Sequence, residues 1–504
     1  MKRIIAALTS MALVIGLAGC STSGTGQDQQ SSSDKTVEEQ LRFTDRDRDP
    51  SYDEASATKI VLDGSGASVT GEGATADGST VTISADGTYV VSGTLADGQV
   101  VVNLPGDDDK AQIVLDGVTI HNEDGPAIQI DQADKVFLTL ADGSTNVLSD
   151  GASYALAEGE DEPYAALYSK DDLTINGSGV LEVTGNYRHA IASKDDTVIT
   201  GGTIVITSVE DAVRGNDAIK IGGGNITVNA GDDAFHSEYL FYIADGTVDV
   251  ESCVEGYEAE KIFVHGGETS IVASDDGVNA SAAEDSTSTD DASQGAAPQD
   301  SQPPAMPQGD QSPAMTQGDE GIPPTRPQGD AGERPQDGMT PPDGQGDRPQ
   351  DAQGPQEGTG PGRQGGDMTM PGASEECLIQ INGGTLVVNA DGDGLDSNGY
   401  IEINGGTVFV NGASNSDDSG LDYEYGATVN GGNVILMGSA AMAEDFTGGT
   451  QAHLMERLSG SAGSTVEVTD DSGTVLVSYV SPKAFQAVTA SAPGCADIIV
   501  RYGK

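Results

Sequence analysis

The sequence predicts an all-β chain, a right-handed single-stranded parallel β-helix of about 22 residues per coil, with a short antiparallel β C-terminal cap and a long disordered loop inserted in one coil. Three observations support this prediction. A segment that begins with a glycine pair returns at a nearly constant interval, apolar residues alternate after each pair, and large apolar side chains are scarce. With 69 glycines, no tryptophan and 4% aromatic residues, the chain can fill a thin, repeated core but not a single thick one.

The repeat is the strongest of these observations. Its copies occupy 201–206, 223–228, 245–250 and 266–271, and then 383–388, 405–410 and 431–436. The second residues of the pairs lie 22, 22 and 21 residues apart before the insertion, and 22 and 26 residues apart after it. In the first copy Ile204 and Ile206 point to the same side, which indicates a strand with one buried face.

Two other architectures with strands at such spacings do not fit. A leucine-rich repeat has a similar length, but no copy follows the Leu-x-x-Leu-x-Leu pattern or offers a helical stretch. Ordinary βαβ units need a crossover helix between parallel strands, and the repeat contains none. A parallel β-helix, in which each coil stacks on the previous one, is the arrangement that remains.

The regions around the repeat complete the domain assignment. Upstream, β-rich runs between 58 and 165 are less evenly spaced, as terminal coils usually are, and runs within 464–500 predict antiparallel strands that cap the open end. The aligned acid moves from Asp276 to Asp393, a step of 117 residues that equals one coil plus about 95 inserted residues. We therefore assign a lipoprotein signal peptide (1–19), a flexible tether (20–42), the β-helix (43–281 and 375–460), a disordered loop rich in Pro, Gln, Gly and Asp (282–374) and a C-terminal β cap (461–504).

The N-terminus indicates secretion. Lys2 and Arg3 precede an apolar run that ends in Leu-Ala-Gly before Cys20, which is the pattern of a secretory signal peptide and resembles a bacterial lipobox. This predicts a lipid on Cys20 and a location on the outer face of the cell membrane, as a lipoprotein. No later segment approaches the roughly 18 apolar residues of a membrane helix, so we expect contact with the membrane through the lipid anchor only.

The net charge of the chain limits the classes of partner that it can bind. A formal net charge of −58 argues against nucleic acid and against an anionic membrane surface, because both require Lys and Arg. It favours hard cations, which are bound by carboxylate oxygens.

Apart from Cys20, the cysteines are Cys253, Cys377 and Cys495, whose spacings match no zinc or redox pattern. We expect buried thiols, and a single disulfide among them is the alternative.

One acidic residue occupies the same place in five successive coils, about nine residues after the glycine pair. These residues are Asp211, Asp233, Glu255, Asp276 and Asp393, and their steps of 22, 22, 21 and 117 follow the structural repeat. Equivalent residues of stacked strands lie about 4.8 Å apart, where two like charges repel by roughly 3 kcal/mol at an effective dielectric constant of 20. Few basic residues accompany the column, so calcium is the natural counter-charge. The predicted calcium ligands are Asp211, Asp232, Asp233, Glu255, Asp275, Asp276, Asp391, Asp393 and Asp396. The alternative is that Asp-Gly merely marks turns.

A second row lies three residues after the acid in each coil. Arg214, His236, Glu258 and Asn279 occupy it and are candidates for contact with sugar hydroxyls and carboxylates. The same row is equally suited to neutralising the acidic column. A separate group, Asp417, Asp418, Asp422 and Glu424, is either another calcium site or a solvated bulge.

These features give the chain a family resemblance. The segment from Phe43 to Glu54, with the coils Asp-Asp-Ala-Phe-His-Ser and Asp-Asp-Gly-Val-Asn-Ala, resembles the clostridial calcium-binding, carbohydrate-binding β-helix proteins. That family is similar to pectate lyases in fold, and the resemblance implies binding of cellulose and acidic, pectin-like sugars without cleavage. It also implies that the five column acids hold the metal. The Pro/Gln-rich insertion departs from the family pattern.

The resulting expectation is a non-catalytic, calcium-dependent binder of polysaccharide, acidic or cellulosic, that works as a monomer at the cell surface. Two alternatives stay open. A polysaccharide lyase would need a Lys or Arg base beside the calcium, and a shared fold does not transfer activity. A calcium-stiffened adhesin or spacer would bind no sugar at all.

Overall fold

The computed structural model describes residues 36–157, 159–282, 373–414 and 418–502. These residues belong to one compact unit, formed by Met1–Glu284 and Met370–Lys504. The predicted signal peptide, Cys20, most of the predicted tether and loop, and Asp417 lie outside the described residues. In the part of the chain that is described, no helix is long and apolar enough to cross a membrane.

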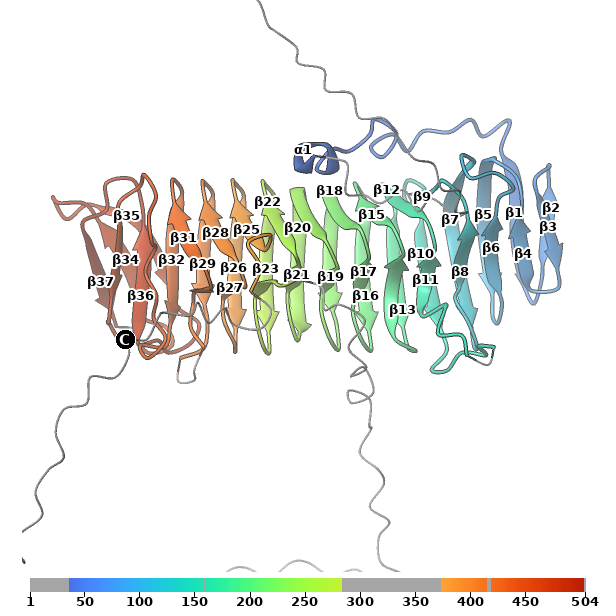
Figure 1. Ribbon diagram of the computed structural model, residues 1–504. Coiled ribbons are helices and arrows are strands. Elements are labelled where there is room, and N and C mark those ends of the chain that lie inside the picture. The colour runs from blue at the N-terminus through green and yellow to red at the C-terminus, as the bar shows by residue number, and fades with distance from the viewer. Residues whose placement is uncertain (1–35, 158, 283–372, 415–417, 503–504) are drawn as a thin grey trace, which may run out of the picture. The chain divides into compact units, whose positions relative to one another are not determined.

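The strands stack in parallel, coil upon coil, and confirm the predicted β-helix (Figure 1). A regular coil has three faces. The third face is a 12-stranded sheet: β3 (Ala74–Asp77), β4 (Thr80–Ile83), β6 (Gln99–Asn103), β8 (Ile128–Gln132), β11 (Ala165–Ser169), β14 (His189–Ser193), β17 (Val213–Gly215), β19 (Phe235–Ser237), β21 (Tyr257–Ala259), β24 (Val278–Ala280), β27 (Leu395–Ser397) and β30 (Asp422–Tyr423).

The first and second faces join into one 22-stranded sheet, because β7 (Lys110–Asn122), β18 (Ala218–Asn229) and β20 (Leu240–Cys253) run across both. The first face also contains β9 (Lys135–Leu140), β12 (Asp172–Gly177), β15 (Asp196–Ile199), β22 (Lys261–Val264), β25 (Leu378–Ile381), β28 (Tyr400–Ile403) and β31 (Gly426–Val429). The second face contains β10 (Thr145–Asp150), β13 (Val180–Gly185), β16 (Thr203–Ser208), β23 (Glu268–Ala273), β26 (Thr385–Ala390), β29 (Thr407–Asn411) and β32 (Asn433–Gly438). At the N-terminal end, β1 (Thr58–Gly64) pairs with β5 (Gly87–Leu95) and with the antiparallel strand β2 (Ala67–Thr70).

The register gives the length of a coil directly. On the third face Val213 pairs with Phe235 and Phe235 with Tyr257, steps of 22 residues, and Tyr257 pairs with Val278, a step of 21. The coil on either side of the insertion stacks without a break, since Val278 pairs with Leu395. The insertion therefore leaves the stack intact, as the sequence predicted.

The core follows from the alternation. In β16 every second residue is buried, with Ile204 and Ile206 fully covered, and equivalent residues of neighbouring coils extend one continuous apolar cluster through the stack. The aromatic rings of Phe235 and Tyr257 on the third face are fully buried in this core and offer no platform for a sugar. Such thin layers need no large side chain, which agrees with the composition.

The glycine pairs recur for a conformational reason. The second glycine of each pair has a positive φ, for example +91° at Gly202 and +77° at Gly384. A Cβ at Gly384 would also lie 2.7 Å from the backbone of Gly266 in the coil before. Only glycine meets both requirements without strain.

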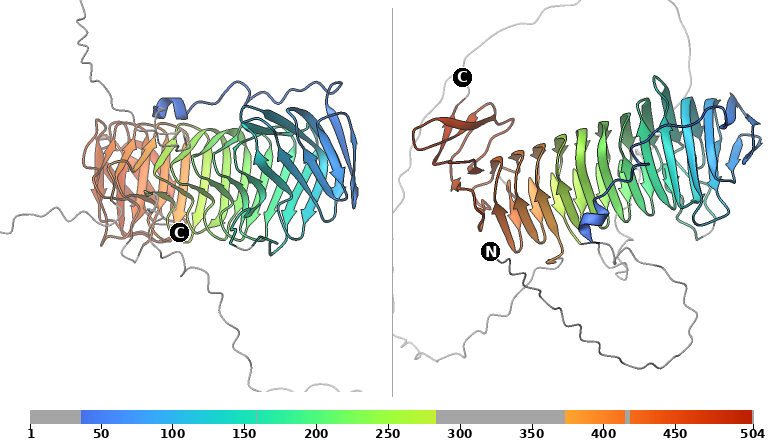
Figure 2. Two further views of the ribbon diagram at one scale, coloured as in Figure 1. Left: turned by 45° about the vertical axis from the view of Figure 1, so that its right-hand side comes forward. Right: turned by 90° about the horizontal axis from the view of Figure 1, so that it is seen from above.

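The segment 43–57 corrects the predicted boundary of the β-helix. It contains no strand and runs along the outside of the stacked strands, after a short helix α1 (Val37–Gln40), as Figure 2 shows. We call residues 36–49 the strap. Its charged residues contact polar residues on the outer side of the first face. The segment lacks the apolar side that a strand would place in the core. Asp47 is only 2% exposed, and its carboxylate pairs with Lys135 at 3.0 Å.

The C-terminal cap begins earlier than predicted. β33 (His453–Glu456) and β36 (Ala487–Ser491) pair antiparallel, and β36 also closes the edge of β32. The predicted antiparallel strands at 464–500 are present as β34 (Thr465–Thr469), β35 (Val475–Val480) and β37 (Asp497–Arg501). β36 runs antiparallel to β32 and so covers the edge of the second face after the last coil.

The three described cysteines are buried and unpaired. Cys253 lies at the end of β20 and its thiol donates to the carbonyl oxygen of Val272. The expectation of buried thiols is confirmed, and the alternative of a disulfide among them does not hold.

Candidate functional site

The structure places the five predicted acids in adjacent coils, so that they form a column. Asp211, Asp233, Glu255, Asp276 and Asp393 each directly precede a strand of the third face, one in each of five stacked coils. The coils are linked through these side chains. The backbone N–H of Asp393 donates to Oδ1 of Asp276 at 2.6 Å, and the N–H of Asp233 donates to Oδ1 of Asp211 at 3.3 Å.

These hydrogen bonds reveal a structural role that the sequence did not predict. Oδ1 of Asp211, Asp233 and Asp276 accepts the N–H of Asp233, Glu255 and Asp393 in the next coil, and Oδ1 of Asp393 accepts that of Ser419 at 2.5 Å. Glu255 instead accepts from the side chain of Asn279. A carboxylate at this position therefore satisfies a backbone donor at the corner of the coil. The second oxygen of each side chain is left for other partners.

In the N-terminal part of the column, basic side chains supply the counter-charge. Nη1 of Arg214 lies 2.9 Å from Oδ2 of Asp211. Nδ1 of His236 lies 3.0 Å from Oδ2 of Asp233 and 2.6 Å from Oε2 of Glu258. Arg214, His236 and Glu258 thus form ion pairs within the site, which is the neutralising role that the sequence left open.

The electrostatics of His236 follow from these contacts. Burial lowers the pKa of His236, but the hydrogen bonds to Asp233 and Glu258 outweigh it and raise the pKa to about 10. Burial raises the pKa of Glu258, yet the bond and the charge of His236 bring it down to about 2. The pair therefore exists as imidazolium and carboxylate at neutral pH. Asp233, His236 and Glu258 each offer a ligand atom within 4.8 Å of the others, so this triad is one candidate metal centre.

The C-terminal part of the column is different. Asp276, Asp393 and Asp396 lie together with Asp422, and none of the four forms an ion pair with a basic side chain in the described part of the chain. Burial raises the pKa of Asp393 to about 8, and the charges of Asp276 and Asp422 add to it. Burial and the same two charges raise the pKa of Asp396 to about 7. We call Asp276, Asp393, Asp396 and Asp422 the acidic group.

The sequence placed Asp422 in a separate group, with Asp417, Asp418 and Glu424. The row of Arg214, His236, Glu258 and Asn279 continues through Asp396 to Asp422, because Asp396 pairs with Asp422 across β27 and β30. The step of 26 residues equals the step between the last two glycine pairs, so alignment of the longer coil would have revealed it. The supposed second cluster therefore adjoins the column.

The remaining predicted residues lie at the edge of the site. Asp232, Asp275 and Asp391 are exposed, and Asp391 lies 3.4 Å from Nζ of Lys483 in the cap. Glu255 lies between the triad and the acidic group: burial and the charge of Glu258 raise its pKa to about 9, and Asn279 donates to it at 3.0 Å. Lys220 and Lys261 do not contribute to the column, because they lie on the first face and pair with Asp196 and Glu260.

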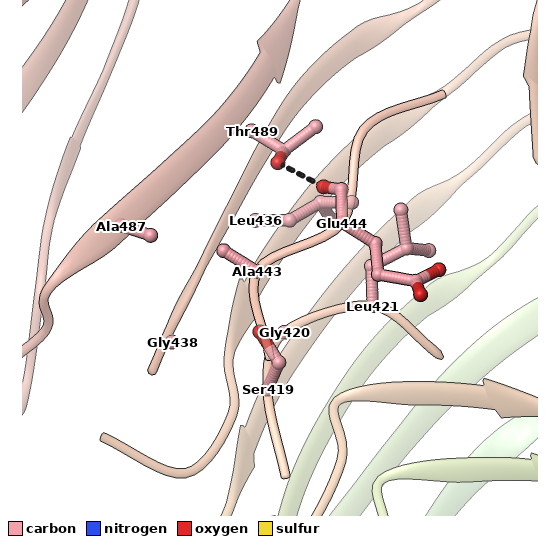
Figure 3. Close-up of a pocket in the computed structure, with 9 residues that line it drawn as sticks. All are labelled: Ser419, Gly420, Leu421, Leu436, Gly438, Ala443, Glu444, Ala487 and Thr489. Carbon is pink, nitrogen blue, oxygen red and sulfur yellow. Dashed lines mark hydrogen bonds between the residues drawn. The ribbon is translucent and has the colours of Figure 1, made fainter. Parts of the chain in front are cut away.

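A small hollow between the last coil and the cap is no alternative site. It is lined by Ser419, Leu436, Glu444 and Thr489 among others, and Thr489 closes it by donating to the main-chain oxygen of Glu444 at 2.7 Å (Figure 3). Its volume of about 10 Å³ is enough for a water molecule but for no larger ligand.

Comparison with known proteins finds similarity to carbohydrate-binding domain-containing proteins. Residues 77–299 match the model of a family described as carbohydrate-binding domain-containing protein. A curated relative of that description from Acetivibrio thermocellus is 41% identical over 127 residues, which are 25% of this chain. The chain spans 44% of the length of that relative. The resemblance inferred from the sequence is thereby confirmed.

A solved structure is also similar. It is the gadolinium derivative of a polysaccharide lyase-like protein from C. thermocellum, with 32% sequence identity and a TM-score of 0.42. The likeness covers 43% of this chain and 91% of that one.

Proposed function

We propose that this chain is a non-catalytic, calcium-dependent carbohydrate-binding protein whose ligand is a polysaccharide, acidic or cellulosic. The observation that carries the proposal is the acidic group, four aspartates gathered at the end of the column without a cationic partner in the described chain. The match of residues 77–299 to the carbohydrate-binding family supports the class of ligand.

Calcium fits the acidic group better than it fits the triad. Calcium takes six to eight oxygen ligands, and the acidic group offers only oxygens. The triad includes the imidazole of His236, a ligand typical of transition metals, and this side chain already pairs with both carboxylates. Asp276, Asp393, Asp396 and Asp422 are therefore the residues that would hold calcium, and bound calcium would bridge them to oxygens outside the protein.

The identity of those outside oxygens links the metal to the ligand. Oδ1 of Asp276 and Oδ1 of Asp393 already accept backbone N–H groups. With one oxygen from each carboxylate, the coordination shell of calcium would keep two to four places for water or a ligand. A uronate carboxylate carries the charge that a partly satisfied calcium ion attracts most strongly. An acidic polysaccharide is thus the ligand that this arrangement favours, and no aromatic platform is required for it.

The basic residues argue for binding rather than lysis. A lyase needs an unprotonated Lys or Arg near the metal to remove a proton from the sugar. Arg214 is held by Asp211. Burial lowers the pKa of Arg214, but the charge and the hydrogen bond of Asp211 outweigh it and raise that pKa above its ordinary value. His236 is held as an imidazolium between two carboxylates. Neither side chain is prepared to act as a base.

The cellular context of the proposal comes from the N-terminus. Lipid attachment at Cys20 would place the binding face on the outside of the cell membrane, with contact through the anchor only. Expression of the full chain with Cys20→Ser tests this, because the variant should lose its membrane association. We also expect a monomer, which light scattering of the purified chain measures.

The decisive experiment is a pull-down on insoluble acidic and neutral polysaccharides, in calcium and in EDTA. Binding to acidic polysaccharide in calcium alone is the expected result. Asp393→Asn and Asp396→Asn should weaken it at least about tenfold, which corresponds to the loss of one good charge-assisted contact of about 1.4 kcal/mol. Asp249→Asn, an exposed aspartate on the second face, is the matched control and should bind normally. Release of unsaturated uronate products would instead indicate a lyase, and failure to bind any polysaccharide would leave the spacer alternative.

A further inference from the structure

A second cavity lies on a different face of the molecule, under the strap. It has a volume of about 470 Å³, which falls within the range of small-ligand sites. Its walls come from the strap on one side and from the first-face ends of β15, β18 and β20 on the other. Figure 2 shows the strap passing along the outside of these strands. No residue of the acidic column lines this cavity.

The strap is anchored firmly enough to serve as a wall. Oγ1 of Thr174 donates to the buried carboxylate of Asp47 at 2.8 Å, and Oγ1 of Thr200 donates to the main-chain oxygen of Asp47 at 2.5 Å. The Phe43 ring packs on Tyr242 with 5.7 Å between ring centroids. Residues on both sides of the cavity are thus fixed by contacts outside it, so that the cavity is pre-formed.

The floor of the cavity exists because one residue is small. Ala218 occupies a row of the first face in which Asp196 precedes it and Leu240 follows it in adjacent coils. The methyl group of Ala218 leaves a gap between these two longer side chains. The half-buried ring of Tyr239 lies beside Ala218 as apolar surface of the floor, whereas Leu240 is fully buried beneath it.

Charged side chains of both signs surround this floor. Nζ of Lys220 lies 2.6 Å from Oδ2 of Asp196, and both residues line the cavity. Nζ of Lys135 lies 3.0 Å from Asp47 and 3.6 Å from Asp172, and all three line it as well. Strong hydrogen-bond donors and acceptors therefore alternate around an apolar patch.

This combination excludes several ligand classes. Three cationic side chains line the space, which disfavours a metal ion, and five acidic side chains line it too, which disfavours a carboxylate or phosphate. A wholly apolar ligand would cover these ion pairs without offering any hydrogen bond in place of water. A sugar ring satisfies both parts, since its C–H face packs on the floor and each hydroxyl both donates and accepts.

We infer that the cavity between the strap and Ala218 is a calcium-independent binding site for one neutral sugar unit. The inference rests on the proposed carbohydrate binding but not on its calcium site. The ligand is a neutral pyranose, either free as a short oligosaccharide or at the end of a polysaccharide chain. Lys220 and Asp196 would bind adjacent hydroxyls, and Tyr239, which carries Lys261 on one side of its ring at 4.6 Å, would support the ring of the sugar from the edge of the floor.

The test uses the full chain in EDTA, titrated by calorimetry with neutral disaccharides (cellobiose, xylobiose and mannobiose) and with digalacturonate. Binding of at least one neutral disaccharide, and weaker or no binding of digalacturonate, is expected. Ala218→Leu fills the gap between Asp196 and Leu240 and should weaken binding at least about tenfold, or about 1.4 kcal/mol. Ala218→Ser keeps the volume and is the matched control.

Three outcomes overturn the inference: no neutral sugar binds in EDTA, Ala218→Leu binds as tightly as the unaltered chain, or digalacturonate binds better than every neutral sugar. Lys220→Gln, which removes the charge and shortens the side chain by one atom, should also weaken binding and guards against misfolding of the first variant. Insoluble neutral glucan in the same buffer separates the two sources, because capture by the glucan requires recognition of a chain end. The calcium site is tested apart from this one, since Asp393→Asn should weaken acidic-polysaccharide binding and leave the neutral sugar bound.

Discussion

Removal of calcium should make the stability of the fold fall as the pH rises through neutrality. Burial and neighbouring carboxylates raise the pKa of Asp396 to about 7 and that of Asp393 to about 8, from an ordinary value of 3.8. Between the unfolded and the folded pKa, the folded chain holds a proton that the unfolded chain has released. The free energy of unfolding therefore decreases with pH across this window and levels off above the folded pKa.

The magnitude follows from the linkage. Each proton held only by the folded chain lowers the free energy of unfolding by about 1.4 kcal/mol per pH unit. One proton kept by the acidic group from pH 6.5 to pH 8 amounts to about 2 kcal/mol. The window begins at 6.5 because burial lowers the pKa of His189 to about 4, and His189 contributes the opposite sign between 4 and its ordinary 6.5. His236, with its pKa raised to about 10, adds a proton of the same sign that is common to every variant compared.

The assay is urea unfolding of the full chain at both pH values, followed by circular dichroism, in EDTA and in millimolar calcium. In EDTA the unaltered chain should lose about 2 kcal/mol more between pH 6.5 and pH 8 than Asp393→Asn, whose amide retains the acceptor for the N–H of Ser419. Calcium should flatten the profile of the unaltered chain, because the metal replaces the proton. Asp249→Asn should behave as the unaltered chain does. Equal pH slopes for Asp393→Asn and the unaltered chain would refute the reasoning, and an unchanged midpoint in calcium would refute the metal.

Three further results are expected. His236→Gln removes the cation between two carboxylates and should cost about 1–3 kcal/mol of stability near neutral pH, as measured by urea unfolding, whereas His121→Gln on a more exposed site should cost little. Gly384→Ala should cost more than Gly473→Ala, about 2–4 against about 1–2 kcal/mol, because both have a positive φ but only Gly384 has a backbone neighbour within 4 Å of the new Cβ. A similar cost for the two would contradict the crowding argument. The three buried thiols should react with an aromatic disulfide reagent only at the rate of unfolding, and rapid reaction of the native chain would show that they are accessible.

Most of the fold was predictable because the repeat fixes the register. Once Ile204, Ile226 and Val248 are aligned by their glycines, parallel pairing follows, and the structure has these residues paired across neighbouring strands. The insertion was predictable for the same reason, since a step of 117 residues still preserves the spacing of one coil. The start of the β-helix and the start of the cap were predicted less accurately, because the strap and β33 do not follow the repeat.

The candidate site was predictable only in part. The column acids could be aligned, but their use as acceptors for the N–H of the next coil depends on how each corner turns, which spacing does not determine. The balance of charge in the column also depends on where the basic side chains point, which the sequence does not determine. His236 reaches both Asp233 and Glu258, so basic residues offset more of the column than their number suggested. Asp422 was separated from Asp396 by a longer coil, whose extra residues hid the match.

The strap has a consequence for cooperativity. In a solenoid each coil contacts only its neighbours, so coils can melt one by one from an end. The strap breaks this rule, because Arg46 bonds Gln112 in β7 while Arg48 bonds Gly222 in β18, and Asp47 contacts the coils between them. Fraying of any one of these coils must release contacts to several others, which ties them into a single unfolding unit. The strap can therefore dock only after its partners, which follow it by 66 to 174 residues in the chain, have left the ribosome and stacked.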